Sequence, residues 1–161
     1  MGCKINYKIV KKKLPNGVVS TMDLIEHPGA SLIIPFLSPR RMIFIRQYRA
    51  AINQYIIELP AGTRDKKEPY LKCAQRELIE ETGYAAKKFK RLGKIYPVPG
   101  YSDEEIVIYR ADDLYQSQAL KDFDEIIETC VMSRREVNKM LKDGKIADAK
   151  TICALTMCGW C

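Results

Sequence analysis

The chain has 161 residues, a net charge of +7 at pH 7 and a 29% content of charged residues. This length suits a single domain, 1–161, whose hydrophobic core needs no disulfide support. No apolar run approaches the roughly 20 residues of a membrane-spanning helix, and the first residues lack the apolar core of a signal peptide, so we expect a cytoplasmic protein without a membrane anchor.

The first sixty residues are predicted to form strands. Asn16-Gly17 is a typical turn between the two strands of a hairpin. Ser38-Pro39-Arg40 marks a second turn between two mostly apolar segments. The predicted strands are 5–13, 18–27, 30–36, 41–48 and 55–59.

A helix is predicted between Pro69 and Gly83. Proline suits the first turn of a helix because its missing N–H has no intrahelical partner there. Glycine is favoured just past the end because it adopts the left-handed conformation at little cost. Four residues recur at helical spacing and are expected to face the core: Leu71, Ala74, Leu78 and Thr82.

In the second half of the chain, strands and helices follow one another irregularly. Ser133 and Glu136 have the spacing of a capping box, which predicts a helix that continues to about Lys142. Asp148 is predicted to cap a last helix that runs through Leu155. The other predicted elements are strands at 88–97, 104–110 and 126–132 and a mobile acidic loop at 112–125. This arrangement predicts an α+β fold with a mixed sheet.

The six cysteines lack the spacing of a disulfide framework, so we expect reduced thiols. Cys158 and Cys161 form a lone C-x-x-C pair. A zinc site needs about four ligands, and the only histidine, His27, is far away in the sequence, so we assign no zinc or redox role to the pair. Three further cysteines are expected to be buried and to pack as small apolar side chains: Cys73, Cys130 and Cys153.

Three glutamates crowd the end of the predicted helix. Glu77 and Glu81 are i,i+4 neighbours on one face, and Glu80 lies beside them. Like charges at this spacing destabilise a helix, and the helix dipole disfavours anions near the C-terminal end. Arg76 can pair with Glu80 but cannot neutralise all three carboxylates. A bound hard cation such as Mg²⁺ or Mn²⁺ would remove the penalty, whereas the alternative interpretation is a solvated acidic face.

The spacing of these residues extends over residues 62–84, where Gly62-x5-Glu68-x7-Arg76-Glu77-Leu78-x-Glu80-Glu81-x-Gly83-Tyr84 resembles the Nudix box, Gx5Ex7REUxEExGU. Only Tyr84 departs from the pattern, because it replaces an aliphatic residue. The resemblance implies a Nudix-type α/β/α sandwich around a mixed sheet. It implies metal ligation by Glu77, Glu80, Glu81 and the carbonyl of Ala61, with Arg76 orienting the glutamates.

Segments outside the box resemble the ADP-ribose pyrophosphatase branch of this family. They include Arg46-Gln47-Tyr48-Arg49, Glu58-Leu59-Pro60-Ala61-Gly62, residues 99–104 and residues 144–151. This similarity implies hydrolysis of a nucleoside diphosphate derivative, with ADP-ribose or another ADP-sugar as the expected substrate, to AMP and a sugar phosphate. The residues implied in substrate binding are Arg46, Arg49, Glu58, Gly100, Ser102 and Glu104. The alternative interpretation of Arg46 and Arg49 is that they are exposed strand residues. The alternative interpretation of residues 99–104 is an ordinary Pro-Gly turn.

The branch carries its catalytic glutamate in a loop before the last strand, and the resemblance aligns Glu125 with the second acidic position there. Phe123 stands where the usual base would be, which is a departure from the pattern. Asp122 or Asp124 could supply the base instead, or the water could rely on the metal alone.

The strand pair in residues 1–28 resembles the dimerisation region of the branch, so we expect a homodimer. Tyr7 is its only aromatic residue, which puts the usual adenine stacking in doubt. The basic charge favours acidic partners, but no aromatic and basic platform for single-stranded nucleic acid is evident. Two alternatives stay open: another substrate, such as GDP-mannose, NADH, a dinucleoside polyphosphate or capped RNA, or a nucleotide sensor without turnover.

Overall fold

The computed structural model describes residues 5–65, 67–117 and 126–161. Its strands are β1 (Asn6–Lys13), β2 (Val19–Glu26), β3 (Ala30–Ser38), β4 (Arg41–Arg49), β5 (Gln54–Glu58), β6 (Ala61–Thr63), β7 (Tyr84–Ile95), β8 (Ile106–Gln116) and β9 (Ile127–Ser133). Its helices are α1 (Tyr70–Thr82), α2 (Arg134–Lys142), α3 (Ala149–Met157) and the 3-10 turn η1 (Ala50–Ile52).

The large sheet has the strand order β5-β4-β3-β8-β7, with β6 paired to β3 and β9 paired to β4. The pairing of β3 with β8 is parallel, and the other strand pairs of this sheet in the described residues are antiparallel. Because β3 is covered on both faces, it is a nearly continuous apolar strand. The α+β class with a mixed sheet is therefore confirmed.

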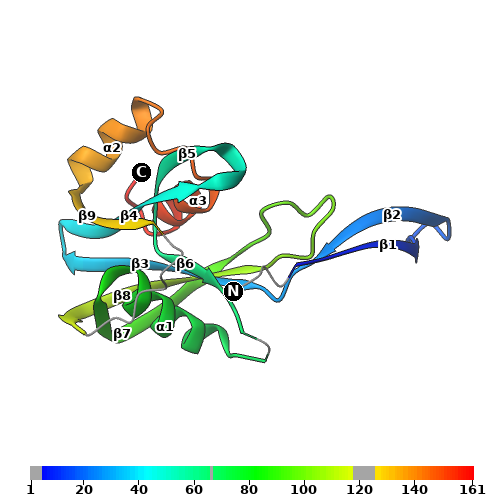
Figure 1. Cartoon of the computed structure of the whole chain (residues 1–161), viewed down its shortest axis with the longest axis horizontal. Helices are drawn as coiled ribbons and strands as arrows, with labels where there is room; N and C mark the ends of the chain where they lie inside the picture. Colours follow the sequence, from blue (N-terminus) through cyan, green and yellow to red (C-terminus); the bar gives the residue numbers. More distant parts are fainter. Residues whose placement is uncertain (1–4, 66, 118–125) are drawn as a thin grey trace.

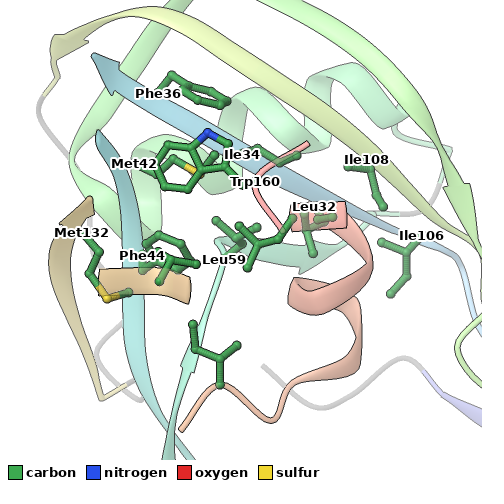
Figure 2. Close-up of a cluster of buried hydrophobic side chains, with 14 of the residues drawn as sticks. Leu32, Ile34, Phe36, Met42, Phe44, Leu59, Ile106, Ile108, Met132 and Trp160 are labelled. Atoms are coloured by element: carbon green, nitrogen blue, oxygen red, sulfur yellow. The ribbon is translucent and has the colours of Figure 1, made fainter. Parts of the chain in front are cut away.

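Helices cover both faces of this sheet (Figure 1). On one face, Ala74 and Leu78 of α1 pack against Ile33 of β3 and Val107 of β8. On the other face, α2 and α3 cover a larger core, part of which Figure 2 shows, where Trp160 meets Phe36 edge-on with ring centroids 5.6 Å apart. Alternate residues of β3 thus serve two cores, as the period of two in a strand requires.

Strands β1 and β2 form a separate two-stranded sheet that extends away from the body of the molecule (Figure 1). Apolar side chains on it stay exposed, including Tyr7 at 61%, Ile9 at 67% and Val19 at 62%. An isolated two-stranded sheet is marginally stable in water at best. The predicted N-terminal strand pair is confirmed, and several of its apolar side chains are exposed.

The predicted helix caps at Ser133, Asp148 and Gly83 are confirmed, whereas Pro69, which was predicted in the first turn of α1, lies just before the helix as its N-cap residue. Ser133 and Glu136 form the expected capping box at α2, and the Asp148 side chain accepts a hydrogen bond from the N–H of Thr151 at α3. Gly83 ends α1 in the left-handed conformation, with φ of 74°. No helix in the described part of the chain is both long enough and apolar enough to cross a membrane.

Several local predictions were wrong. Leu71 is 40% exposed, because the buried face of α1 is set by Cys73, Ala74, Glu77 and Leu78. Residues 112–116, predicted as part of a loop, continue β8, where they pair with β7. Polar strand residues are tolerated there because the paired backbone needs only one buried face.

The expectation for the cysteines holds only in part. Cys73 is buried, but Cys130 is half-buried and Cys153 is exposed. The five cysteines within the described ranges are all free thiols, which agrees with the expected reduced state.

Candidate active site

Helix α1 lies beside the short strand β6, and the closest approach between them is at Gly62. A Cβ atom built on Gly62 would stand 1.9 Å from Cδ of Glu77. That distance is impossible for real atoms, so the absence of a side chain at Gly62 is what lets the Glu77 carboxylate occupy this position. Gly62 and Glu77 are fifteen positions apart in the sequence, and the fold brings them into direct contact.

The guanidinium of Arg76 links the acidic residues of α1 to the preceding loop. Its Nη1 donates to Oε1 of Glu77 at 2.6 Å and to Oε2 of Glu80 at 2.8 Å. Its Nε and Nη2 donate to the two oxygens of Glu68 at 3.1 and 3.0 Å. Hydrogen bonds to Glu68, and then to the other glutamates, raise the pKa of Arg76, so it stays charged. The pKa of Glu68 is lowered in return by Arg76.

Glu81 is the innermost of the three helix glutamates, at 5% exposure. Its Oε2 accepts a hydrogen bond from the backbone N–H of Ala61 at 2.9 Å. This bond fixes the carboxylate beside the strand end that carries Ala61 and Gly62. Glu80 by contrast keeps its side chain 38% exposed, at the edge of the cluster.

The donor set of this cluster suits a hard divalent cation. Among the described residues, no three acidic, histidine or cysteine side chains already surround a common point closely enough to form a finished metal cage. Nevertheless Glu77 and Glu81 are nearly buried carboxylates on one helix face, and Gly62 leaves space for one of them. All candidate ligands are oxygens, as Mg²⁺ and Mn²⁺ prefer.

A second charged group lies on β4 and β5. Arg49 donates from Nε and Nη2 to the two oxygens of Glu58, at 2.7 and 2.8 Å. Lys150 at the start of α3 also donates to Glu58 and to Asp148. Burial acts to raise the pKa of Glu58, but Arg49 and Lys150 outweigh it, so the pKa is lowered overall. The charge of Glu81 also acts on Arg49, which places this group within electrostatic reach of the α1 carboxylates.

Arg46 does not join this group. It alternates with Arg49 along β4, so its side chain lies on the opposite face. There it donates to Glu128 at 3.1 Å and stacks 3.9 Å over the ring of Tyr55. The sequence therefore predicted two ligand-binding arginines, and the structure brings only Arg49 near the glutamate cluster.

The loop at residues 96–105 is attached to the base of the β1–β2 hairpin. The N–H of Ile25 donates to the carbonyl of Tyr101 at 2.8 Å, and Oγ of Ser102 donates to the carbonyl of Ile25 at 3.1 Å. Glu104 lies 3.8 Å from Nε2 of His27. Gly100 has no atom within 4 Å of a built Cβ, so it lies on the open side of the loop. Ser102 thus holds the loop, while Gly100 and Glu104 stay more accessible.

The predicted catalytic Glu125, its alternatives Asp122 and Asp124, and Phe123 lie outside the described residues. Two contributors were missed by the sequence reasoning. Glu68 anchors Arg76, and its fixed place in the 62–84 pattern was the available signal. Lys150 shares Glu58 with Arg49, and only the resemblance at 144–151 pointed to that segment.

The chain is similar to known proteins along most of its length. The model of the NUDIX domain family matches residues 26–155. An ADP-ribose pyrophosphatase of Bacillus subtilis (strain 168) is 32% identical over 156 residues, covering 96% of this chain and 84% of that protein. A GDP-mannose pyrophosphatase of Escherichia coli is 32% identical over 136 residues, covering 79% of this chain and 71% of that protein.

Among solved structures, one described as an ADP compounds hydrolase superposes with a TM-score of 0.80 at 24% identity, covering 98% of this chain and 85% of that one. At this identity the superposition shows the fold alone. Because the family model spans most of the sequence, the chain belongs to the Nudix family. It is a Nudix hydrolase, and ADP-ribose pyrophosphatases are among its relatives.

Proposed function

We propose that this chain hydrolyses the pyrophosphate bond of ADP-ribose or another ADP-sugar, giving AMP and a sugar phosphate, with Mg²⁺ or Mn²⁺ as the cofactor. The observation that carries the proposal is the contact between Gly62 and Glu77, which holds a buried carboxylate on the same helix face as Glu81. The similarity to the Bacillus subtilis ADP-ribose pyrophosphatase over nearly the whole chain supports the choice of substrate.

In this proposal, Glu77 and Glu81 hold the metal, with Glu80 and the carbonyl of Ala61 assisting. The cation, when bound, would neutralise the pyrophosphate and lower the pKa of the attacking water. Arg76 keeps Glu77 and Glu80 in place through charge-assisted hydrogen bonds. Such bonds to a ligand carboxylate fix its orientation, which is a positioning role.

Arg49 and Glu58 form the neighbouring wall of the proposed substrate site. Both oxygens of Glu58 already accept from Arg49, and one also accepts from Lys150. Glu58 therefore suits the role of holding the side chains of Arg49 and Lys150 in place. The planar guanidinium of Arg49 suits phosphate oxygens. Gly100, Ser102 and Glu104 are proposed to form the loop over the distal ribose, and Arg46 is a weaker candidate because it lies on the opposite face of β4. Glu125 stays the proposed base.

The direct test is incubation of the purified protein with ADP-ribose and Mg²⁺, with products identified by mass. We expect AMP and ribose 5-phosphate, and no AMP above a no-enzyme control would overturn the proposal. Glu81→Gln is expected to lose most activity and to weaken Mn²⁺ binding in a calorimetric titration. Asp143→Asn is the matched control, because its exposed carboxylate on the α2 side pairs only with Lys139 at 3.8 Å among the described residues.

GDP-mannose is the second candidate substrate, favoured by the similarity to the Escherichia coli GDP-mannose pyrophosphatase. Both reactions would use the same helix, so the two candidates differ only in base and sugar recognition. A panel with ADP-ribose, GDP-mannose, NADH, a dinucleoside polyphosphate and capped RNA at equal concentration decides between them. Thermal stabilisation by a nucleotide without turnover would favour the sensor instead.

We also propose a homodimer that forms through the β1–β2 hairpin of residues 1–28. Its apolar side chains are largely exposed, and an isolated two-stranded sheet is only marginally stable in water. A second copy would bury them. The cytoplasmic location and the single domain over 1–161 stay predictions.

A further inference from the structure

Gln47 on β4 has an unsatisfied polar atom. Gln47 is only 5% exposed, and its Oε1 atom has no hydrogen-bond partner. Among the described residues, this oxygen is the one buried side-chain polar atom without a partner. Buried polar groups in folded proteins are nearly always hydrogen-bonded. In the unfolded chain water bonds to them, so a group that is buried without a partner loses that hydrogen bond on folding. An orphaned acceptor therefore destabilises the ligand-free protein and needs a reason.

The strand register places this amide beside the charged wall of the site. Gln47 lies opposite Ile56 of β5 and Ile127 of β9. Residues directly opposite each other share a face, and so do alternate residues of one strand. Gln47 thus shares its face with Arg49, and Glu58 is on that face too, because it lies opposite Ile45.

This face is turned away from the core under α2 and α3. Met42 and Phe44 of β4 belong to that core, so the intervening positions point to the other side. Glu81 of α1 acts electrostatically on Arg49, which is two positions from Gln47. The orphaned oxygen accordingly belongs to the wall that faces the α1 carboxylates.

We propose that Oε1 of Gln47 binds the nucleotide by accepting a hydrogen bond from one of its neutral donors, a ribose hydroxyl or the exocyclic amine of the base. An amide oxygen has no proton to give, so it cannot bond to a phosphate oxygen. A site built to accept a hydrogen bond discriminates against an analogue that lacks the donor, since the buried acceptor is then left unpaired. Gln47 would therefore determine specificity rather than take part in the chemical step. This inference rests on the proposed function.

The test is Gln47→Met, which keeps the length of the side chain and removes the amide. Because the variant loses an unsatisfied group, its ligand-free melting temperature is expected to equal or exceed that of the wild type. Its KM for ADP-ribose is expected to rise about tenfold with kcat nearly unchanged, as for the loss of one uniform binding contact. Gln116→Met is the matched control, because the amide of Gln116 at the end of β8 is exposed.

Substrate analogues that each lack one hydrogen-bond donor identify the group that Gln47 binds. An analogue with hypoxanthine in place of adenine lacks the exocyclic amine, and 2′-deoxy analogues lack one hydroxyl at a time. The wild type is expected to discriminate against one of them, and Gln47→Met is expected to lose that discrimination. A lower melting temperature with unchanged KM and unchanged discrimination would overturn the inference, since the amide would then serve the fold alone. An inactive wild type would overturn the proposed function instead.

Discussion

Gly62 and Glu77 are matched to each other: the space that a Cβ on Gly62 would fill is occupied by the carboxyl group of Glu77, 1.9 Å away. This contact explains why β6 and α1 can approach so closely. It also implies that the position of one proposed metal ligand is set from the strand and not from the helix alone.

The first prediction concerns this contact. Gly62→Ala must push the Glu77 carboxylate away from its place, and a displacement of about 1 Å at a reacting site can reduce a rate about a hundredfold. We expect kcat to fall by about that factor, with weaker Mn²⁺ binding. Gly93→Ala is the matched control, because its Cβ would meet only the flexible end of Met157, at 2.3 Å. Equal effects in both variants would mean that crowding, not ligand position, is responsible.

Arg76 gives the second prediction. Its planar guanidinium spans Glu68, Glu77 and Glu80, whereas a lysine offers a single point charge. Arg76→Lys is expected to lower metal affinity and activity by about 10- to 100-fold, the usual effect of losing a group that orients a ligand. Calorimetric Mn²⁺ titration measures this. Arg135→Lys on the exposed side of α2 should leave both unchanged, and a wild-type affinity in Arg76→Lys would contradict the positioning role.

The third prediction concerns acid stability. Since the pKa of Glu58 is lowered in the folded protein, its ionised form contributes stability above its ordinary pKa of 4.5, and this contribution is lost as the pH falls through the folded value. Glu58→Gln is expected to destabilise the protein by about 1–3 kcal/mol at pH 7, because Arg49 and Lys150 lose their shared partner.

Urea unfolding at pH 7 and pH 3 tests this expectation. The difference between wild type and Glu58→Gln should be smaller at pH 3, which lies below the ordinary pKa of 4.5, because protonation of Glu58 in the unfolded chain then offsets part of what its ion pairs contribute. Glu128→Gln serves as the comparison, because its ion pair with Arg46 is exposed and should contribute little at either pH. A difference that does not depend on pH would show that Glu58 acts through packing.

The fourth prediction addresses assembly through the hairpin. Ile9 is 67% exposed on β1, and Ile9→Lys would place a charge in the proposed contact surface. Analytical ultracentrifugation should give twice the 18.5 kDa chain mass for the wild type and the single-chain mass for the variant. Lys12→Ala, on the other face of β1, should stay dimeric. A monomeric wild type would rule out the dimer.

Local chemistry made part of this structure predictable. The caps at Ser133 and Asp148 and the stop at Gly83 depend on residues within four positions of one another, so their pattern in the sequence is sufficient. The glutamates of α1 were predictable for the same reason, because helical spacing alone puts Glu77 and Glu81 on one face. The roles of the other positions in residues 62–84 were implied only by the resemblance to the Nudix box.

The placement of long-range partners could not be predicted in this way. Whether Leu71 is buried depends on which face of α1 the sheet covers, and whether Cys153 is buried depends on how α3 lies on β3. Likewise Arg46 and Arg49 are equivalent by residue type, and the strand register alone puts one beside Glu58 and the other against Tyr55.

The sequence by itself determined that this chain has the residues of the Nudix box, since those residues lie on one helix with its flanking loop. Only the tertiary structure decided that Gly62 makes room for Glu77, that Lys150 shares Glu58 with Arg49, and that Gln47 keeps an unpaired oxygen on the same wall. The physical reason is that contacts between residues distant along the chain follow from sheet register and close packing, which no local spacing encodes.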